Sequence, residues 1–424
     1  MQRVEDQRLL RGQGRFVDNL NISGQAYLYV VRSYLGHAKI QRINTESISQ
    51  MSGVLAVFIG EDLIRDGILP IPVTLPYKRP GGEPALSDPY HALAQGMVRF
   101  VGQPVAVVVA ESKAEGQEAG ECLEIEYEEI PAVTDLQKAV APEAPRLCDA
   151  LPDNIAAAHT EGDAEKVEQA FAQAAHVTRM DLVNTRLVGS PLEPRGLLCD
   201  IEQKTGMLTL HAMHQSATRL HGVLCTVFQL ESQQLRIVVR DIGGGFGTKV
   251  AIHPEDVLVV YAAKKMNRPV KWTATRTEEF LASIHSRDLR NFAELACDSE
   301  GRILALRMRT LANTGAYLNN PALFIPLGLM PKVITSVYNI PVMYLDTNCV
   351  LTNTAPIGAY RGAGRPEGIY PMERLMDMAA REMGMDPITI RERNLIRTES
   401  LPYRTLVGDV IDSGDFQDVM KRAV

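Results

Sequence analysis

The stretch RDIGGGFGTK, residues 240–249, surrounds a single phenylalanine with four glycines. Glycine loses more conformational freedom on folding than any other residue, so a run of three indicates positive φ angles or a ligand lying against the main chain. Residues 235–240 are rich in β-branched side chains, which predicts a strand before the loop. Pro254, followed by two acidic residues, predicts that a helix begins after it. The sequence therefore predicts a glycine-rich loop between a strand and a helix.

Such a loop has two interpretations: it offers free N–H groups to an anion, or it is a tight turn without a ligand. Two familiar phosphate-binding loops are excluded. A P-loop has lysine directly after its last glycine, but here Thr248 precedes Lys249. The dinucleotide fingerprint G-x-G-x-x-G fails from Gly243, because its sixth position is Thr248, and from Gly244, because its third position is Phe246.

A second glycine-rich loop, AYRGAGRPE at residues 359–367, repeats this design. Apolar residues at 369, 372, 376, 379 and 383 predict an amphipathic helix over 369–383, ended by Gly384. We interpret the methionine-rich stripe of this helix as core. Arg361 and Arg365 stand at the helix N-terminus, where guanidinium and N–H groups together suit a phosphate. The alternative is a pair of surface arginines on a turn.

Composition excludes several classes of function. The 424 residues suffice for two or three domains, and 44 basic against 51 acidic residues give a net charge of −7, which argues against a nucleic-acid partner. Apolar runs such as 105–110 are far too short for a membrane span, and the N-terminus lacks the apolar segment of a signal peptide. The six scattered cysteines form no C-x-x-C pair, so we expect a cytoplasmic protein without a zinc site, a disulfide framework or iron–sulfur ligands of its own.

The pattern along the rest of the chain predicts an α+β fold. A proline-rich loop is predicted over 69–84, a linker over 131–152, and a helix capped by Asp163 and ending near 175. Another helix, capped by Asp386, is predicted to end near 395. Residues 112–127 are predicted as a helix that runs into a strand. Further strands are predicted over 25–32, 54–59, 101–110, 207–213 and 303–313.

In motif and order, the two glycine loops resemble the molybdenum-binding large subunit of the xanthine dehydrogenase/aldehyde oxidase family. Four more segments fit the same family: RVEDQRLLRGQGRFVDNL from Arg3, VRFVGQPVAVVVAES from Val98, PLEPRG from Pro191, and His214 with Gln215. The resemblance implies an α/β hammerhead domain over 1–135, a linker over 136–155 and a first molybdopterin-binding domain over 156–400. Residues 401–424 would then begin a second molybdopterin-binding domain.

The resemblance also implies a molybdopterin-type molybdenum cofactor, in its cytosine dinucleotide form, with no protein side chain as a metal ligand. Gln215 matches a glutamine near a molybdenum oxo group, and Phe246 would lie beside the metal. Arg361 matches an arginine that contacts the cofactor. The implied cofactor-binding residues are Gln215, Gly244, Gly245, Phe246, Gly247, Arg361 and Gly362.

The sequence departs from the family pattern at positions that bear on the substrate. Xanthine-oxidising members have a glutamate at the position of Val250, a phenylalanine at that of Ala363 and an arginine near that of Leu329, so a purine substrate is not expected. Carbon monoxide dehydrogenases have cysteine and serine at the positions of Gly362 and Ala363, so carbon monoxide is not expected either.

The implied function is that of the cofactor-binding portion of a molybdenum hydroxylase. Such an enzyme oxidises a small molecule, here an aldehyde or an N-heterocycle, with water-derived oxygen, and electrons pass to iron–sulfur and FAD subunits. The family's base is a glutamate in the C-terminal half of the molybdenum subunit, expected beyond Val424, so the isolated chain is expected to be inactive. The alternative is a non-catalytic module that binds the cofactor or docks a subunit.

Overall fold

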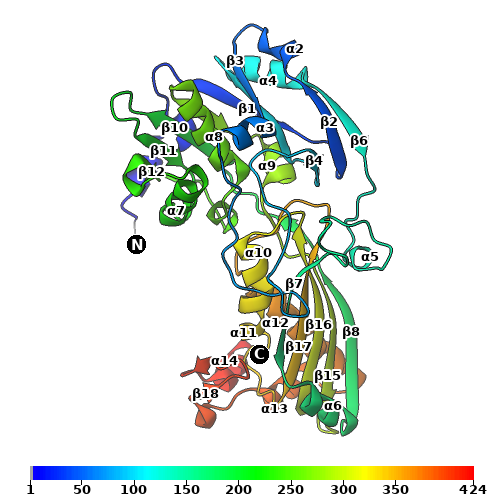
Figure 1. Ribbon diagram of the computed structural model, residues 1–424. Helices are drawn as coiled ribbons and strands as arrows, with labels where there is room; N and C mark the ends of the chain where they lie inside the picture. Colours follow the sequence, from blue (N-terminus) through cyan, green and yellow to red (C-terminus); the bar gives the residue numbers. More distant parts are fainter. Residues whose placement is uncertain (1–2) are drawn as a thin grey trace.

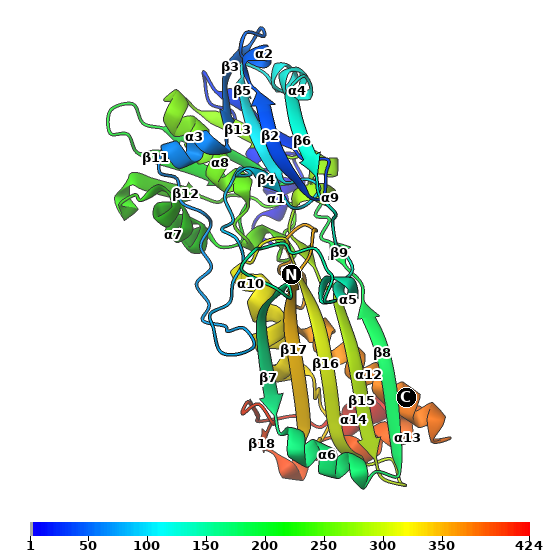
Figure 2. The same ribbon diagram turned by 45° about the vertical axis from the view of Figure 1, so that its right-hand side comes forward.

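The structure, a computed structural model, describes residues 3–424, and these form two lobes (Figures 1 and 2). The upper lobe is built on a seven-stranded sheet and the lower lobe on a five-stranded sheet of long strands. Each lobe has its own main cluster of buried apolar side chains. The fold class is therefore α+β, as predicted.

The sheet of the upper lobe joins segments that lie far apart in the sequence. Strand β1 pairs antiparallel with β5 and parallel with β13, so the N-terminal strands continue into those that flank the first glycine loop. Every residue of β5 is buried, as expected of an apolar central strand. In spatial order the strands are β12 (Leu235–Val238), β11 (Leu208–Ala212), β10 (Gly196–Ile201), β13 (Val270–Thr273), β1 (Ala26–Arg32), β5 (Pro104–Ala110) and β3 (Val54–Ile59).

Helices and a small second sheet complete the upper lobe. Helix α8 (Pro254–Met266) contacts β10 and β13, and α7 (Ala217–Phe228) contacts β12. The small sheet has the order β4 (Met97–Val98), β2 (Ala38–Asn44), β6 (Glu124–Glu129). Shorter elements of this lobe are α1 (Asp6–Leu9), α2 (Glu46–Ser49), α3 (Gly60–Arg65), α4 (Lys113–Glu121) and α9 (Arg276–Ala282).

In the lower lobe, helix α12 (Arg365–Glu382) covers one face of the long sheet, and α6 (Ala164–Ala172) packs against the end of the other face (Figure 2). Its strands have the order β7 (Ile155–Gly162), β17 (Met343–Leu351), β16 (Ile303–Gly315), β15 (Leu289–Cys297), β8 (His176–Asn184). Helix α12 contacts β15 and β8, and its buried Met372 and Met376 confirm that the methionine stripe is core. Other elements here are α5 (Leu136–Ala139), α10 (Asn320–Phe324), α11 (Met330–Val333), α13 (Pro387–Asn394), β18 (Tyr403–Arg404), β19 (Val410–Ile411) and α14 (Phe416–Ala423).

Most predicted elements are confirmed, but two of them begin at other residues than predicted. The strand predicted over 101–110 begins only at Pro104, because Gly102, at φ 97°, lies in a turn. The helix predicted from 369 begins at Arg365, directly after the left-handed Gly364 at φ 84°. The segment predicted as a linker is packed, since Leu136, Leu147 and Leu151 lie in the core of the lower lobe. Strands β7, β8, β15 and β17 were not predicted.

Two further features of the structure concern the helices and the cysteines. Within residues 3–424, no helix combines the length and the apolar character that crossing a bilayer requires. All six cysteines are free thiols, and four of them are buried.

A buried chain of opposite charges ties the upper lobe together. The carboxylate of Glu255, which is 1% exposed, accepts hydrogen bonds from Arg32 Nη2 at 2.7 Å and Arg195 Nη1 at 2.8 Å. Arg195 Nε also donates to Glu279 Oε1 at 2.8 Å. Burial alone would raise the pKa of Glu255, but the two guanidinium groups outweigh it and hold this pKa below its usual value.

We predict that Glu255→Gln lowers the free energy of unfolding by about 3–5 kcal/mol, because it leaves buried guanidinium groups without their counter-charge. Urea unfolding followed by the fluorescence of Trp272, the only tryptophan, measures this loss of stability. Trp272 is a suitable probe because Arg195 of the network lies over its ring. Because the folded pKa is depressed, the stabilisation is present above the unfolded pKa and lost as the pH falls below it. The difference in the free energy of unfolding between wild type and Glu255→Gln should therefore shrink below a pH of about 4.

The matched control is Glu126→Gln, which removes an exposed carboxylate 3.9 Å from Arg42. It should change the free energy of unfolding by no more than about 1 kcal/mol. Equal effects of the two substitutions would show that the buried network has no special role.

Candidate functional site

Two side chains fix the ends of the first glycine loop, which connects β12 to α8. The backbone N–H of Gly243 donates to Glu193 Oε2 at 2.6 Å, and that of Gly247 donates to Gln215 Oε1 at 2.8 Å. Gln215 stands between β11 and α7, and its own N–H donates to the carbonyl of Lys249 at 2.8 Å. Both ends of the loop are therefore held by acceptors from other segments.

The middle of this loop presents unused donors. Within residues 3–424, the N–H groups of Gly244, Gly245 and Phe246 have no hydrogen-bond acceptor. Gly244 and Phe246 have left-handed backbones, with φ 99° and 52°, and the Phe246 side chain is 46% exposed. Consecutive free N–H groups in a curved backbone form an anion-binding concavity. A left-handed phenylalanine is strained, and strain of this kind is concentrated at functional sites.

The second glycine loop, between β17 and α12, lies against the first. The backbone N–H of Arg361 donates to the carbonyl of Phe246 at 2.8 Å, and the rings of Tyr360 and Phe246 have centroids 6.5 Å apart. Gly362 and Gly364 have φ 97° and 84°. The structure therefore brings together the two loops that the sequence singled out.

The seven predicted site residues fall into three groups. Gly244, Gly245, Phe246 and Gly247 form the first loop, Gln215 holds its end, and Arg361 and Gly362 belong to the second loop. The Arg361 side chain is exposed, and within residues 3–424 its guanidinium donates no hydrogen bond. Their roles toward a cofactor stay predictions.

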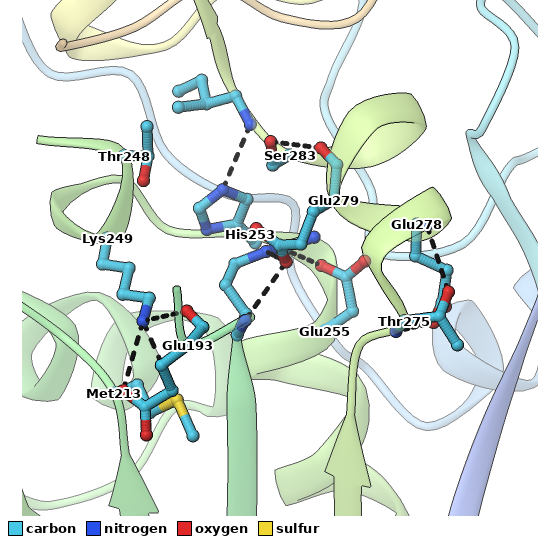
Figure 3. A network of polar contacts seen from close by, with 12 residues as sticks. Glu193, Met213, Thr248, Lys249, His253, Glu255, Thr275, Glu278, Glu279 and Ser283 are labelled. Carbon is cyan, nitrogen blue, oxygen red and sulfur yellow. Dashed lines mark hydrogen bonds and ion pairs between the residues drawn. The ribbon is translucent and has the colours of Figure 1, made fainter. Parts of the chain in front are cut away.

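A buried lysine lies behind the first loop (Figure 3). Lys249, only 1% exposed, donates from Nζ to the backbone carbonyl of Glu193 at 2.8 Å, and Glu193 Oε2 lies 3.4 Å away. Burial lowers the pKa of Lys249, and the Glu193 carboxylate opposes this shift. The same carboxylate oxygen accepts the Gly243 N–H, so the lysine, the glutamate and the loop form one unit.

The second loop has a comparable support, the buried ion pair of Arg287 and Glu367 with 2.7 Å between Nη1 and Oε1. The sequence-based prediction missed Lys249, Glu193, Arg287 and Glu367 as parts of the site. A buried charge follows no periodic pattern. The local signal was that Lys249, Glu367 and Glu193 stand inside the motifs RDIGGGFGTK, AYRGAGRPE and PLEPRG, whereas Arg287 stands in none of them.

A groove of about 880 Å³ adjoins the first loop. It is lined by Leu9 and Phe16 of the N-terminal segment and by Gly243 and Gly244 of the loop. The segment is anchored by Asp241, whose carboxylate accepts from Arg8 Nη2 at 2.8 Å and from the Arg15 N–H at 2.6 Å. The hydrogen bond from Arg8 and that from the Arg15 N–H lower the pKa of Asp241 to about 2.

The donor set of the two loops fits a large anionic group. Among the residues that the structure describes, the first loop has three free backbone N–H groups, and the second loop has the free N–H of Gly362 and the free guanidinium of Arg361. Within residues 3–424, no three His, Cys, Asp or Glu side chains gather in a metal-binding arrangement. The residues present therefore match a cofactor that is held through hydrogen bonds to its anionic part.

Comparison with known proteins identifies the class. Residues 147–395 match the family model of the molybdopterin cofactor-binding domain, and residues 11–131 match the aldehyde oxidase and xanthine dehydrogenase a/b hammerhead domain. The chain belongs to the xanthine dehydrogenase/aldehyde oxidase family, whose members among its relatives are molybdenum hydroxylases.

Individual relatives agree with this assignment. The carbon monoxide dehydrogenase large chain of Hydrogenophaga pseudoflava is 32% identical over 436 residues, covering 99% of this chain and 53% of the relative. The nicotine 6-hydroxylase large subunit of Paenarthrobacter nicotinovorans is 33% identical over 420 residues, covering 99% and 50%. The crystal structure of quinoline 2-oxidoreductase from Pseudomonas putida 86 superposes with a TM-score of 0.93 at 33% identity, covering 100% and 53%.

The chain thus spans about half the length of these relatives. A more distant relative differs in this respect. The nicotinate dehydrogenase large molybdopterin subunit of Eubacterium barkeri, 26% identical, is covered over 91% of its length.

We predict that Gly247→Ala separates the two loops and lowers the molybdenum and pterin content of the assembled enzyme. A Cβ at Gly247 would lie 2.9 Å from the carbonyl oxygen of Ala359, and the backbone has φ 99°. Gly247 is a sharper test than Gly245, where φ is not positive and the obstacle is the Gln215 side chain. Metal and pterin analysis of the purified protein measures the effect.

Gly206→Ala is the control, because Gly206 also has a positive φ, 73°, but nothing lies within 4 Å of its added Cβ. Both variants incur backbone strain of about 1–3 kcal/mol. Only Gly247→Ala should lose cofactor, and equal cofactor contents would contradict the prediction.

Proposed function

We propose that this chain is the cofactor-binding portion of a molybdenum hydroxylase that oxidises an aldehyde or an N-heterocycle with water-derived oxygen. The observation that carries the proposal is the meeting of two glycine loops through the Arg361–Phe246 hydrogen bond, with free donors on both. Family membership supports the cofactor, and the free donors support the place where it binds.

In this proposal the cofactor is of the molybdopterin type, in its cytosine dinucleotide form. The N–H groups of Gly244, Gly245 and Phe246 would bind its anionic part, together with the Arg361 guanidinium. The Gln215 side-chain amide, which already accepts from Gly247, would orient its remaining N–H donors toward the group. The exposed Phe246 ring would exclude water from one side of the site. When bound, the cofactor supplies the two-electron redox chemistry.

The proposed substrate is an aldehyde or an N-heterocycle. Nicotine and quinoline, named for two relatives, are N-heterocycles, which supports this class. Val250, Ala363 and Leu329 replace the polar and aromatic residues associated with purine oxidation. One relative is a carbon monoxide dehydrogenase chain, but Gly362 and Ala363 replace the cysteine and serine associated with that reaction.

The remaining components of the enzyme are proposed to lie outside these 424 residues. They are an iron–sulfur subunit, an FAD subunit and the second half of the molybdenum site, which would contribute the glutamate base. That half would be supplied by the same polypeptide or by a separate subunit, and the relatives of which this chain spans about half support its existence.

The decisive experiment compares residues 1–424 alone with the complete assembly, co-expressed with its neighbouring genes. We predict that the assembly contains molybdenum and pterin and reduces a dye with an aldehyde or an N-heterocycle. The isolated chain should be at least about 10²-fold slower, because it lacks the base. Turnover by the isolated chain would refute the division of the site, and an assembly with cofactor but no turnover would favour a non-catalytic module.

We predict that Arg361→Ala lowers the affinity of the assembly for the cofactor by about 1.5–3 kcal/mol, the usual effect of losing a hydrogen bond to a charged group. The measurement is molybdenum and pterin per chain after dialysis. Arg365→Ala is the matched control, because Arg365 is also exposed but donates to the carbonyl of Ala363 in its own turn at 3.2 Å. Equal losses in the two variants would point to a general effect of charge.

A further inference from the structure

A buried arginine supports the second loop from the side opposite its exposed surface. Arg287 lies in the turn between β14 (His285–Ser286) and β15, and it is 6% exposed. Both Arg287 and Asp288 have left-handed backbones with φ 64°. This turn is fixed by Asp288, whose carboxylate accepts from Arg186 Nε at 2.7 Å and from Asn313 Nδ2 at 2.9 Å.

The guanidinium of Arg287 makes three contacts with the second loop and the helix that follows it. Nη2 donates to the backbone carbonyl of Arg361 at 2.7 Å, and Nη1 donates to that of Tyr360 at 3.3 Å. Nη1 also donates to Glu367 Oε1 at 2.7 Å, and Glu367 is fully buried. The planar guanidinium carries these donors on two separate nitrogen atoms in a fixed geometry, so Arg287 reaches both carbonyls and the carboxylate from one position.

These contacts determine which way the peptide groups of the loop point. A trans peptide is planar, so its N–H points away from its C=O. Because the Tyr360 carbonyl faces Arg287, the N–H of Arg361 points away from it and reaches the carbonyl of Phe246 at 2.8 Å. Because the Arg361 carbonyl also faces Arg287, the N–H of Gly362 points outward, and within residues 3–424 it has no acceptor.

We propose that Arg287 is a positioning residue of the cofactor site: by binding the carbonyls of Tyr360 and Arg361 from inside, it turns the Gly362 N–H toward the cofactor. The inference rests on the proposed function, since the cofactor is the group that this N–H would meet. Arg287 itself does not touch the cofactor. The geometry of the loop, however, can be tested without the cofactor.

Three variants separate positioning from simple stability. Arg287→Lys keeps a positive charge beside Glu367, but its single nitrogen atom cannot occupy the positions of both Nη1 and Nη2. Glu367→Gln removes the counter-charge but keeps the guanidinium and its carbonyl contacts. Arg290→Lys is the control, because Arg290 lies three residues along the same segment and pairs with Asp181 at 2.7 Å on the surface.

The readouts are molybdenum and pterin per folded chain in the complete assembly, and hydrogen–deuterium exchange of residues 358–364 with and without cofactor. We expect Arg287→Lys to lower cofactor content at least about fivefold, the effect of losing one charge-assisted hydrogen bond of the site. It should also speed exchange in this segment of the cofactor-free protein. Arg290→Lys should retain the wild-type content. Glu367→Gln should lose less cofactor than Arg287→Lys, because the guanidinium keeps its contacts with the two carbonyls.

Two results would overturn the proposal. One is a cofactor content in Glu367→Gln that falls as far as in Arg287→Lys, which would assign the effect to the ion pair. The other is a Gly362 amide that gains no protection from exchange when the wild-type protein binds the cofactor. This second test uses only the wild-type protein, so it remains valid even if Arg287→Lys fails to fold. A wild-type assembly without molybdenum or pterin would refute the proposed function instead, while the exchange of the cofactor-free protein would still test the role of Arg287.

Discussion

The hydrogen bond from the Arg361 N–H to the Phe246 carbonyl is the contact on which the candidate site depends. The first loop belongs to the sheet and helices of the upper lobe, and the second loop begins the helix that covers the sheet of the lower lobe. Neither loop alone presents donors on two sides of a ligand. The candidate site therefore lies where the two lobes meet. The residues that hold each loop in place also maintain this contact between the loops.

Each loop has a buried cation behind it, and the two supports use the same chemistry. Lys249 binds a backbone carbonyl and lies beside the carboxylate of Glu193, whereas Arg287 binds two carbonyls and the carboxylate of Glu367. Buried ion pairs add little net stability, because the cost of desolvating both charges offsets their attraction. Their value lies in orientation. Arg287 draws two carbonyls of the second loop inward, which leaves the N–H groups on the opposite edges of the peptides free to face the first loop and a ligand. Lys249 acts through Glu193, whose carboxylate accepts the N–H of Gly243.

The sequence predicts what is local in this architecture. Glycine runs, the proline at the start of α8 and the spacing of Met372 and Met376 each depend on neighbours within a few residues, and these predictions are confirmed. The long sheet is harder to predict, because strands such as β7 and β8 alternate weakly and are defined by partners far along the chain. The Arg287 support could not be predicted, since nothing near it in the sequence distinguishes a buried arginine from an exposed one.

Because the free donors come from both lobes, cofactor binding and the docking of the lobes are thermodynamically linked. A ligand that binds only the docked arrangement stabilises it in proportion to the logarithm of its concentration over its dissociation constant. The linkage also works in reverse, since any change that loosens the Arg361–Phe246 contact reduces the population able to bind. The buried supports of Lys249 and Arg287 keep each loop in its binding conformation before the ligand arrives, so that the cost of ordering the loops is met during folding.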